Sequence, residues 1–245
     1  MKDNFSKQAV VYSKFRPQYP DEMIEYIISY VNNKSIALDV ATGNGQVAHK
    51  FSSYFKNVYA TDISQKQLDN AIKPDTIIYS KEPAEKTSFE NQKFDLIVVA
   101  QATHWFDFDA FYKEIYRILK LDGIFAVMGY GLFSTNPDSD KILHHFYYKI
   151  IGSYWDAERK YLDENYETIP FPFEEIPAKG FENQFTWSFE ELIGYLQTWS
   201  SVQHYISKNN QNPIDLIYDE LKISWHKSDK KVTFPLLLRI GKLNT

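Results

Sequence analysis

The sequence predicts a doubly wound α/β fold with a mostly parallel sheet, and three observations predict it. Between residues 36 and 130, short apolar runs alternate with amphipathic segments, which is the rhythm of βαβ units. The runs are almost continuously apolar, as parallel strands covered on both faces should be. A glycine-containing turn follows the first run and leads into a helix-like stretch, where doubly wound folds bind ligands.

The individual elements follow in chain order. The apolar runs predict strands at Ile36–Val40, Val58–Thr61, Thr76–Tyr79, Phe94–Val99 and Ile124–Met128. Helical spacing and capping signals predict helices at 20–31, Gln46–Phe55, Ser64–Ile72 and Phe108–Leu119. Asp122-Gly123 is expected to end the last of these helices and to turn the chain into the fifth strand.

The remaining residues have a different pattern. Residues 131–180 are rich in loops and aromatic side chains, with one predicted helix at Asp138–Trp155. Beyond them, the sequence predicts a strand at Phe185–Trp187, helices that begin at Ser188 and Pro213, and a last strand at Val232–Ile240. Pro235 predicts an edge or bulge position in that last strand. These two strands and the five named above give an expected sheet of seven strands, within a single domain of residues 1–245.

Composition limits the function classes. The chain has 245 residues, a net charge of −5 and a pI of about 5.7, which disfavours nucleic acid and anionic membranes as partners. It has no cysteine, which excludes disulfides, thiolate metal sites and cysteine nucleophiles and fits a cytoplasmic protein. No apolar run approaches the ~20 residues that span a bilayer, and charged residues interrupt Met1–Lys14, so we expect no signal peptide. We expect a monomer or homodimer.

The residues with the clearest chemistry surround the first strand. Gly43 and Gly45 let the backbone approach a ligand closely, and the following helix directs its amide groups toward it. Asp39, within the strand, can accept hydrogen bonds from a ligand ammonium or from the loop amides, and it would repel a pyrophosphate. Asp62 ends the second strand, where a carboxylate in a doubly wound fold accepts hydrogen bonds from ribose hydroxyls. Together these groups suit a cationic nucleoside amino acid better than NAD.

The pattern Asp39-x-Ala41-x-Gly43-x-Gly45, followed by Asp62, resembles the cofactor motif of class I S-adenosylmethionine methyltransferases. Pro83-Ala84-Glu85, the fourth-strand run from Asp95 to Ala102 and the run from Ile118 to Gly123 resemble later motifs of that family. The resemblance implies S-adenosyl-L-methionine as cofactor, S-adenosyl-L-homocysteine as product and no metal. The cofactor contacts that it implies in the core are Asp39, Ala41, Gly43, Gly45, Asp62, Ile63, Ala84, Glu85 and Gln101.

Four further segments resemble a small-molecule subgroup, the trans-aconitate methyltransferases. These are Tyr12-x-x-x-Arg16-Pro17-x-Tyr19-Pro20, Gln101-Ala102-x-His104-Trp105-Phe106, Gly194-Tyr195-Leu196-x-Thr198-Trp199-Ser200 and Pro235-Leu236-Leu237-Leu238-Arg239-Ile240-Gly241. The likeness implies four parts: residues 1–34 covering the cofactor, with Tyr12 and Arg16 near it; a core at 35–130; a helical, aromatic-rich lid at 131–180 after strand five; and 181–245 completing the sheet.

Several residues have two interpretations. Arg16 could instead be a surface arginine, and Gln101 could hold the methionyl end or face the substrate. His104 could be a general base or a buried structural histidine. Trp105 could stack against the adenine, line the substrate pocket or belong to the core. Tyr148, Trp155 and Tyr166 could line the substrate pocket or form the lid's own core. Arg159 and Lys160 are interpreted as a solvated pair, with contact to an anionic substrate as the alternative.

The overall interpretation is methyl transfer to a carboxylate, hydroxyl or amine of a small organic molecule. Three alternatives stay open. A protein of this fold could bind S-adenosylmethionine without turnover. An NAD-dependent oxidoreductase fits the glycines, with Ala48 in place of a third one, but not Asp39. A macromolecular substrate is disfavoured by the acidic pI. His144-His145 diverge on a helix and suit a shared metal poorly.

Overall fold

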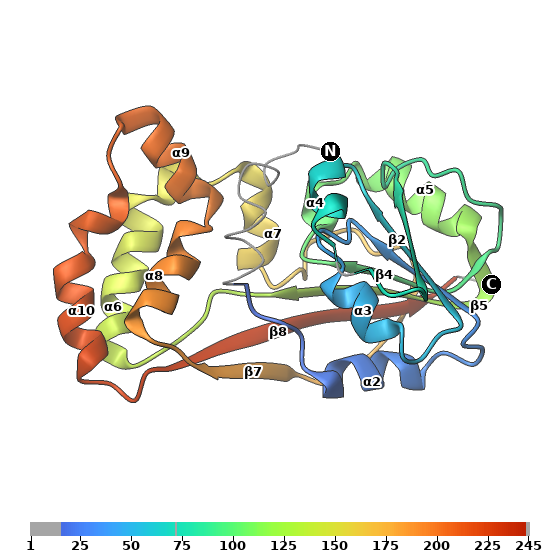
Figure 1. Cartoon of the computed structure of the whole chain (residues 1–245), viewed down its shortest axis with the longest axis horizontal. Coiled ribbons are helices and arrows are strands. Elements are labelled where there is room, and N and C mark those ends of the chain that lie inside the picture. The colour runs from blue at the N-terminus through green and yellow to red at the C-terminus, as the bar shows by residue number, and fades with distance from the viewer. Residues whose placement is uncertain (1–15, 72, 244–245) are drawn as a thin grey trace.

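A mixed sheet forms the centre of the protein, and the computed structural model describes it within residues 16–71 and 73–243 (Figure 1). The strands lie in the order β3-β2-β1-β4-β5-β8-β6, and β7 also pairs with β8. The first five run parallel and the last three join antiparallel. Their bounds are β1 Ile36–Val40, β2 Asn57–Asp62, β3 Ile77–Lys81, β4 Phe94–Ala100, β5 Leu119–Tyr130, β6 Glu174–Ile176, β7 Phe181–Thr186 and β8 Lys231–Lys242.

Helices cover both faces of the parallel strands because the strands are apolar on both sides. Helices α2 (Asp21–Ser29) and α3 (Gln46–Phe51) pack Met23, Ile24 and Phe51 into one core. Helix α5 (Phe108–Ile118) packs Phe111, Ile115 and Ile118 into a second core. Within β4, Val98 belongs to the first core and Val99 to the second, as alternation along a strand requires. The predicted doubly wound fold is confirmed.

The strand order places one crevice at the carboxyl ends of β1, β2 and β4. β1 pairs with β2 on one side and with β4 on the other, so the connections leave it in opposite directions. Open α/β sheets bind ligands at such a switch point. The short helix α4 (Gln65–Asp69) follows β2 at this edge, and Ser64 caps it through a bond from the Gln67 amide.

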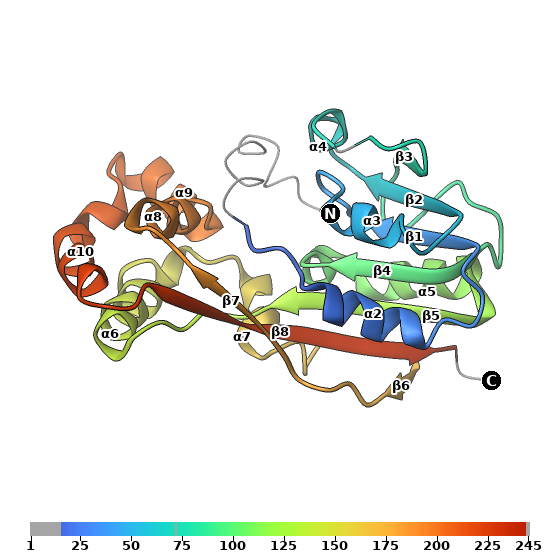
Figure 2. The ribbon, with the colours of Figure 1, turned by 60° about the horizontal axis from the view of Figure 1, so that its bottom comes forward.

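A helical unit lies beside the sheet, at the left of Figure 1. Two separate stretches build it: α6 (Pro137–His145) with a π-helical turn at Phe146–Ile150, and α8 (Phe189–Gln197), α9 (Ser200–Asn209) and α10 (Tyr218–His226). Helix α7 (Lys160–Asp163) lies between this unit and the sheet in both views (Figure 2). Aromatic side chains from both stretches share one core; for example, the rings of Phe146 and Trp199 stack 6.2 Å apart. The lid predicted at 131–180 stays a prediction.

Strand β8 differs from the sequence prediction. We expected Pro235 to mark an edge or a bulge, but β8 has β5 on one side and β6 and β7 on the other. Pro235 accepts a hydrogen bond from the Gly131 amide, one residue past the last pair of β5 with β8. The proline nitrogen points to the same side as this carbonyl, so the second bond of the pair with Gly131 cannot form. Pairing on this side resumes one residue out of register, at Ser134 and Thr233, so Pro235 marks an irregularity although β8 is not an edge strand.

The start of β5 also differs. Asp122-Gly123 does not form a separate turn after α5, because β5 begins at Leu119, directly after the helix. The register of β4 against β5 shifts between Phe94 and Leu96, so residues 120–123 form the irregularity that the glycine had signalled.

Candidate functional site

The loop between β1 and α3 forms the floor of the crevice. Ala41, Gly43 and Gly45 all have positive φ, at 55°, 58° and 82°. At Gly45 a side chain would collide with the hydroxyl of Tyr79, whereas at Gly43 a Cβ would meet nothing within 4 Å. The Thr42 amide donates to the carbonyl of Thr61, 2.8 Å away, which ties the loop to the end of β2. Glycine is therefore required at position 45 for space as well as for backbone conformation.

Asp62 holds both loops of the crevice. Its Oδ2 accepts a hydrogen bond from the Gly43 amide at 2.9 Å, and its Oδ1 accepts one from the Ser64 amide at 2.8 Å. The residue is buried. Asp62 therefore ties the loop after β1 to the start of α4.

Asp39 is fully buried beneath the same loop. Its Oδ2 accepts hydrogen bonds from the Thr42 hydroxyl at 2.6 Å and from the Ala48 amide at 3.0 Å. Its Oδ1 is buried with no hydrogen-bond partner in the described part of the chain. Burial raises the pKa of Asp39 to about 7, and the nearby charge of Asp62 adds to that effect. Asp39 thus both organises the loop and keeps one oxygen unsatisfied.

These groups surround a cavity of about 940 Å³, including its open mouth, at the carboxyl ends of the strands. The predicted residues that line it are Arg16, Asp39, Ala41, Gly43, Asp62, Ile63, Gln101 and Trp105. Polar or aromatic residues that we did not predict as contacts also line it, namely Tyr19, Asn44, Ser64, Gln67 and Tyr130. Ser64 and Tyr130 could have been found, because both follow or end a strand at this edge.

The other predicted cofactor contacts lie differently. Ala84 and Glu85 do not line the cavity: Ala84 is buried in the core on the α5 side, and Oε1 of Glu85 accepts a bond from the Asp107 amide. Gly45 lies under the loop against Tyr79 rather than in the cavity wall. Tyr12 lies outside the described residues.

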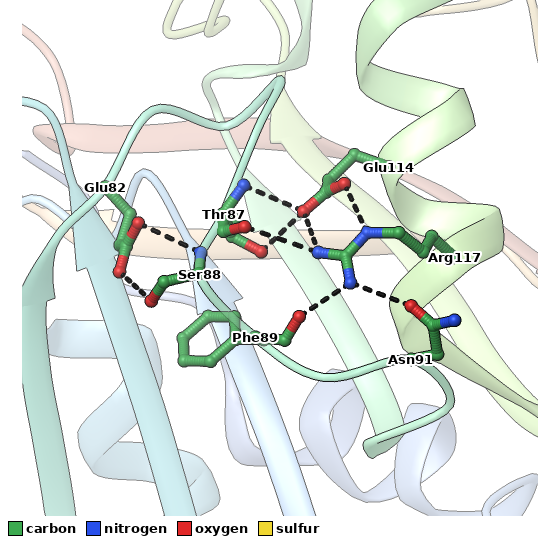
Figure 3. Close-up of polar contacts among 7 residues, drawn as sticks. All are labelled: Glu82, Thr87, Ser88, Phe89, Asn91, Glu114 and Arg117. Carbon is green, nitrogen blue, oxygen red and sulfur yellow. Dashed lines mark hydrogen bonds and ion pairs between the residues drawn. The ribbon is translucent and has the colours of Figure 1, made fainter.

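The loop that carries Ala84 and Glu85 is fastened from α5 (Figure 3). Glu114 Oε1 accepts bonds from the amide and hydroxyl of Thr87, at 2.8 and 2.5 Å. Arg117 donates two hydrogen bonds to Glu114 and one to the carbonyl of Phe89. Although burial alone would raise the pKa of Glu114, the bonds from Arg117 and Thr87 hold it below its usual value.

Gln101 and Arg16 join the first cavity to a second one. The Gln101 side chain accepts a bond from the Tyr130 amide at 2.8 Å and donates to its carbonyl at 3.3 Å, which extends the pairing of β4 with β5. Arg16 donates to the Tyr130 hydroxyl at 2.8 Å and to the Thr198 carbonyl at 3.3 Å. Arg16 is therefore part-buried and engaged with the helical unit, not a free surface arginine.

The second cavity, about 430 Å³ including its mouth, lies between the sheet edge and the helical unit. It shares Arg16, Gln101 and Trp105 with the first cavity. Its other lining residues are His104, Trp155, Asp156, Arg159, Leu162, Trp199 and Ser200. Of the predicted substrate contacts, Trp105 and Trp155 line it. Tyr148 does not, and its side chain is 58% exposed.

His104 and Tyr166 form a buried pair at the wall of this cavity. His104 Nδ1 lies 3.0 Å from the Tyr166 hydroxyl oxygen, and Tyr166 itself is wholly buried behind it. Burial, together with the charges of Arg159 and Arg16, lowers the pKa of His104 to about 3. The imidazole is neutral near pH 7, where a base whose conjugate acid has so low a pKa is weak.

The interpretation of Arg159 as part of a solvated pair is wrong. Its side chain is only 15% exposed, because Tyr147 and Trp155 cover it. Its Nε donates to the Tyr147 hydroxyl at 2.6 Å and to Asp163 at 3.3 Å. Lys160, the next residue, is exposed. No local signal in the sequence distinguishes the two, since the burial comes from residues distant along the chain.

Residues 16–71 and 73–243 contain neither a metal-binding cluster of side chains nor a membrane-spanning helix. No group of three or more histidine, aspartate or glutamate side chains gathers there in an arrangement that could hold a metal ion. None of the helices in those ranges combines the length and apolar character needed to cross a membrane.

Known proteins resemble the whole chain. Residues 38–127 match the methyltransferase domain family. A Dictyostelium discoideum protein that carries a methyltransferase name is 34% identical over 98% of this chain and 95% of its own. A solved structure from Anaeromyxobacter dehalogenans, named as a type II methyltransferase, has a TM-score of 0.86 at 31% identity and covers 94% of this chain and 100% of that chain. A Haemonchus contortus phosphoethanolamine N-methyltransferase, in complex with S-adenosylhomocysteine, shares the fold alone, at a TM-score of 0.51 and 16% identity, over 98% of this chain and 58% of that chain.

Proposed function

Because the chain belongs to the class I S-adenosylmethionine-dependent methyltransferases, we propose that it methylates a small organic molecule at a carboxylate, hydroxyl or amine. The subgroup similar to trans-aconitate methyltransferases is part of this proposal. It is supported by the motifs around Arg16, His104 and Thr198, which gather at the two cavities.

The residues of the first cavity fit the cofactor. Oδ1 of Asp39 is a buried acceptor that lacks a partner, which a ligand ammonium or a bound water would satisfy. Asp62 lines the cavity at the end of β2, where a carboxylate accepts hydrogen bonds from ribose hydroxyls in doubly wound folds. The backbone amides of the loop after β1 precede the amino end of α3, as at other sites for nucleosides.

One observation supports the choice of a small substrate. The second cavity lies next to the first and shares Arg16, Gln101 and Trp105 with it. Its walls are mostly side chains of the sheet edge and the helical unit, and three of them are tryptophans. A recess walled in this way suits a small molecule better than a folded macromolecule.

When bound, S-adenosylmethionine supplies a methyl group that is already activated for transfer. The protein then has to hold the acceptor atom in line and to exclude water. Trp105, Trp155 and Trp199 provide an apolar wall for this purpose. Neutral His104 is suited to hydrogen bonding rather than to proton removal, which favours an acceptor that is nucleophilic without a base.

The test is binding followed by turnover. We expect calorimetry to show that S-adenosylmethionine and S-adenosylhomocysteine bind the purified protein and that NAD does not. Asp62→Ala should weaken both complexes by about tenfold or more, because it removes charged hydrogen-bond acceptors. S-adenosylhomocysteine formation should then be measured with panels of small acids, alcohols and amines, and with bulk protein and RNA. Turnover with protein or RNA alone contradicts the small-molecule proposal.

A further inference from the structure

The second cavity contains hydrogen-bonding atoms that nothing in the described chain satisfies. Nη1 and Nη2 of Arg159 make no hydrogen bond in residues 16–71 and 73–243, although Nε is bonded to Tyr147 and Asp163. Nε1 of Trp155 is buried and also lacks a partner there. Both residues line the cavity. A buried donor is normally satisfied, so Nε1 of Trp155 indicates a missing acceptor, and the two terminal nitrogens of Arg159 are further donors at the same cavity.

Arg159 is held in a fixed position. The Tyr147 hydroxyl and the Asp163 carboxylate fix its Nε, and its guanidinium carbon lies 4.6 Å from the centre of the Trp155 ring. A guanidinium that is fixed at Nε still presents its two terminal nitrogens, and this fork matches the two oxygens of a carboxylate. The indole N–H of Trp155 comes from the same short segment and is a third donor.

The same cavity limits the charge of the ligand. Asp156 also lines it, and its Oδ2 is buried without a hydrogen bond, 3.9 Å from His204. A carboxylate at this place repels a second negative charge and can accept a hydrogen bond from a ligand hydroxyl or ammonium. Arg16, the other cation that lines this cavity, already donates to Tyr130 and Thr198, so we assign one anionic group to Arg159 and no second one beside it.

The location of Arg159 assigns a role to that anionic group. Arg16, Gln101 and Trp105 line both cavities, whereas Arg159, Trp155 and Asp156 line only the second. An anionic group at Arg159 is thus set away from the cofactor cavity. Hydrogen bonds from the Arg159 guanidinium also make the oxygens of this group weaker nucleophiles for methyl transfer.

We propose that Arg159 and Trp155 bind a single carboxylate of the methyl acceptor as an anchor, and that a different atom of the acceptor receives the methyl group. This inference rests on the proposed function and adds the substrate class: small organic monoanions. Arg159 and Trp155 are substrate-binding residues in this assignment.

The test uses the full chain saturated with S-adenosylhomocysteine and matched pairs of probes. Benzoate is compared with benzamide, and hexanoate with hexanamide, by calorimetry. We expect each acid to bind about tenfold or more tightly than its amide, because charged hydrogen bonds are stronger than neutral ones. Phenyl phosphate and tricarballylate carry more charge and should bind more weakly than benzoate.

Three variants separate the anchor from general electrostatics. Arg159→Gln should abolish the preference for acid over amide. Trp155→Phe keeps an aromatic ring and removes one donor, so it should weaken the acids about threefold to tenfold and leave the amides unchanged. Lys160→Gln removes the neighbouring exposed charge and should change neither. Circular dichroism checks that each variant is folded.

The proposal is overturned if acids and amides bind the native protein equally, if no acid binds, or if Arg159→Gln retains the preference. Tighter binding of phenyl phosphate or tricarballylate than of benzoate overturns the monoanion assignment. S-adenosylhomocysteine binding, measured first in every variant, reports on the proposed function separately. If the native protein did not bind S-adenosylhomocysteine, that result would contradict the proposed function and not the anchor.

Discussion

His104 Nδ1 and the hydroxyl oxygen of Tyr166 lie 3.0 Å apart, and both side chains are buried. The histidine pKa is about 3 there, because burial disfavours the charged ring and two arginines add to the effect. The pair is therefore a neutral hydrogen bond between the wall of the second cavity and the segment after α7. Protonation of His104 therefore affects the free energy of unfolding of the whole protein.

Acid should destabilise the protein through His104. In the unfolded chain this histidine takes up a proton below a pH of about 6.5, whereas in the folded chain it stays neutral down to a pH of about 3. Stability is therefore lost as the pH falls from 6.5, by up to about 1.4 kcal/mol per pH unit. Urea denaturation at pH 7.5 and 5.5 should show a smaller loss for His104→Asn than for the native protein. His49→Asn, at an exposed position, is the control; an unchanged loss in His104→Asn contradicts the prediction.

Asp39→Asn should act in opposite directions on stability and on binding. The folded pKa of Asp39 is about 7, above the ordinary value, so its ionisation destabilises the ligand-free protein as the pH rises from 4 through 7. At pH 8 the variant should be more stable by up to roughly 3 kcal/mol, and at pH 4 it should show no gain. Cofactor binding should weaken about tenfold or more, because an amide replaces the unpartnered oxygen. Urea denaturation and calorimetry measure the two effects, and a gain at pH 4 equal to that at pH 8 would disprove the charge argument.

Alanine substitutions at the two glycines of the β1–α3 loop should have different effects on stability. Gly43→Ala introduces a methyl group that meets no neighbour within 4 Å, in a residue that lines the cavity. It should cost about 1–2 kcal/mol of stability through its positive φ and should also weaken cofactor binding. Gly45→Ala adds a collision with the Tyr79 hydroxyl and should destabilise the protein further. Tyr79→Phe should partly rescue Gly45→Ala and not Gly43→Ala; thermal unfolding of the four variants decides.

Glu114→Gln should loosen the loop between β3 and β4. The change leaves Arg117 and Thr87 without a charged partner, so we expect a loss of about 1–3 kcal/mol in the free energy of unfolding. Glu90→Gln, an exposed position in the same loop, is the matched control. Equal behaviour of the two variants would show that the network in Figure 3 is not a support of the loop.

The sequence was informative wherever local pattern and long-range structure agree. Each parallel strand is buried on both faces, so an apolar run such as 94–99 indicates a strand without knowledge of its neighbours. Asp39, Gly43 and Asp62 were predictable because they stand at the ends of such strands, where the fold requires a ligand site.

The helical unit and Arg159 were not predictable in the same way. The unit joins residues 137–163 to residues 189–226 by packing of aromatic rings, which no local periodicity records. Arg159 became a buried residue only through Tyr147 and Trp155. For Ala84 and Glu85 a local motif was misleading. The family motif predicts that they contact the cofactor, but in this structure neither residue lines the cavity.

The position of β8 has a consequence for the order in which a growing chain can fold on the ribosome. Strands β1 to β5, with the first cavity, are synthesised before residue 131. Until residues 231–242 emerge, the backbone of β5 stays unpaired on one side, and β6 and β7 have no strand to join. Such an open edge recruits other chains during synthesis. The strands that line the first cavity are therefore complete early, but the β5 edge stays open to association with other chains until β8 is made.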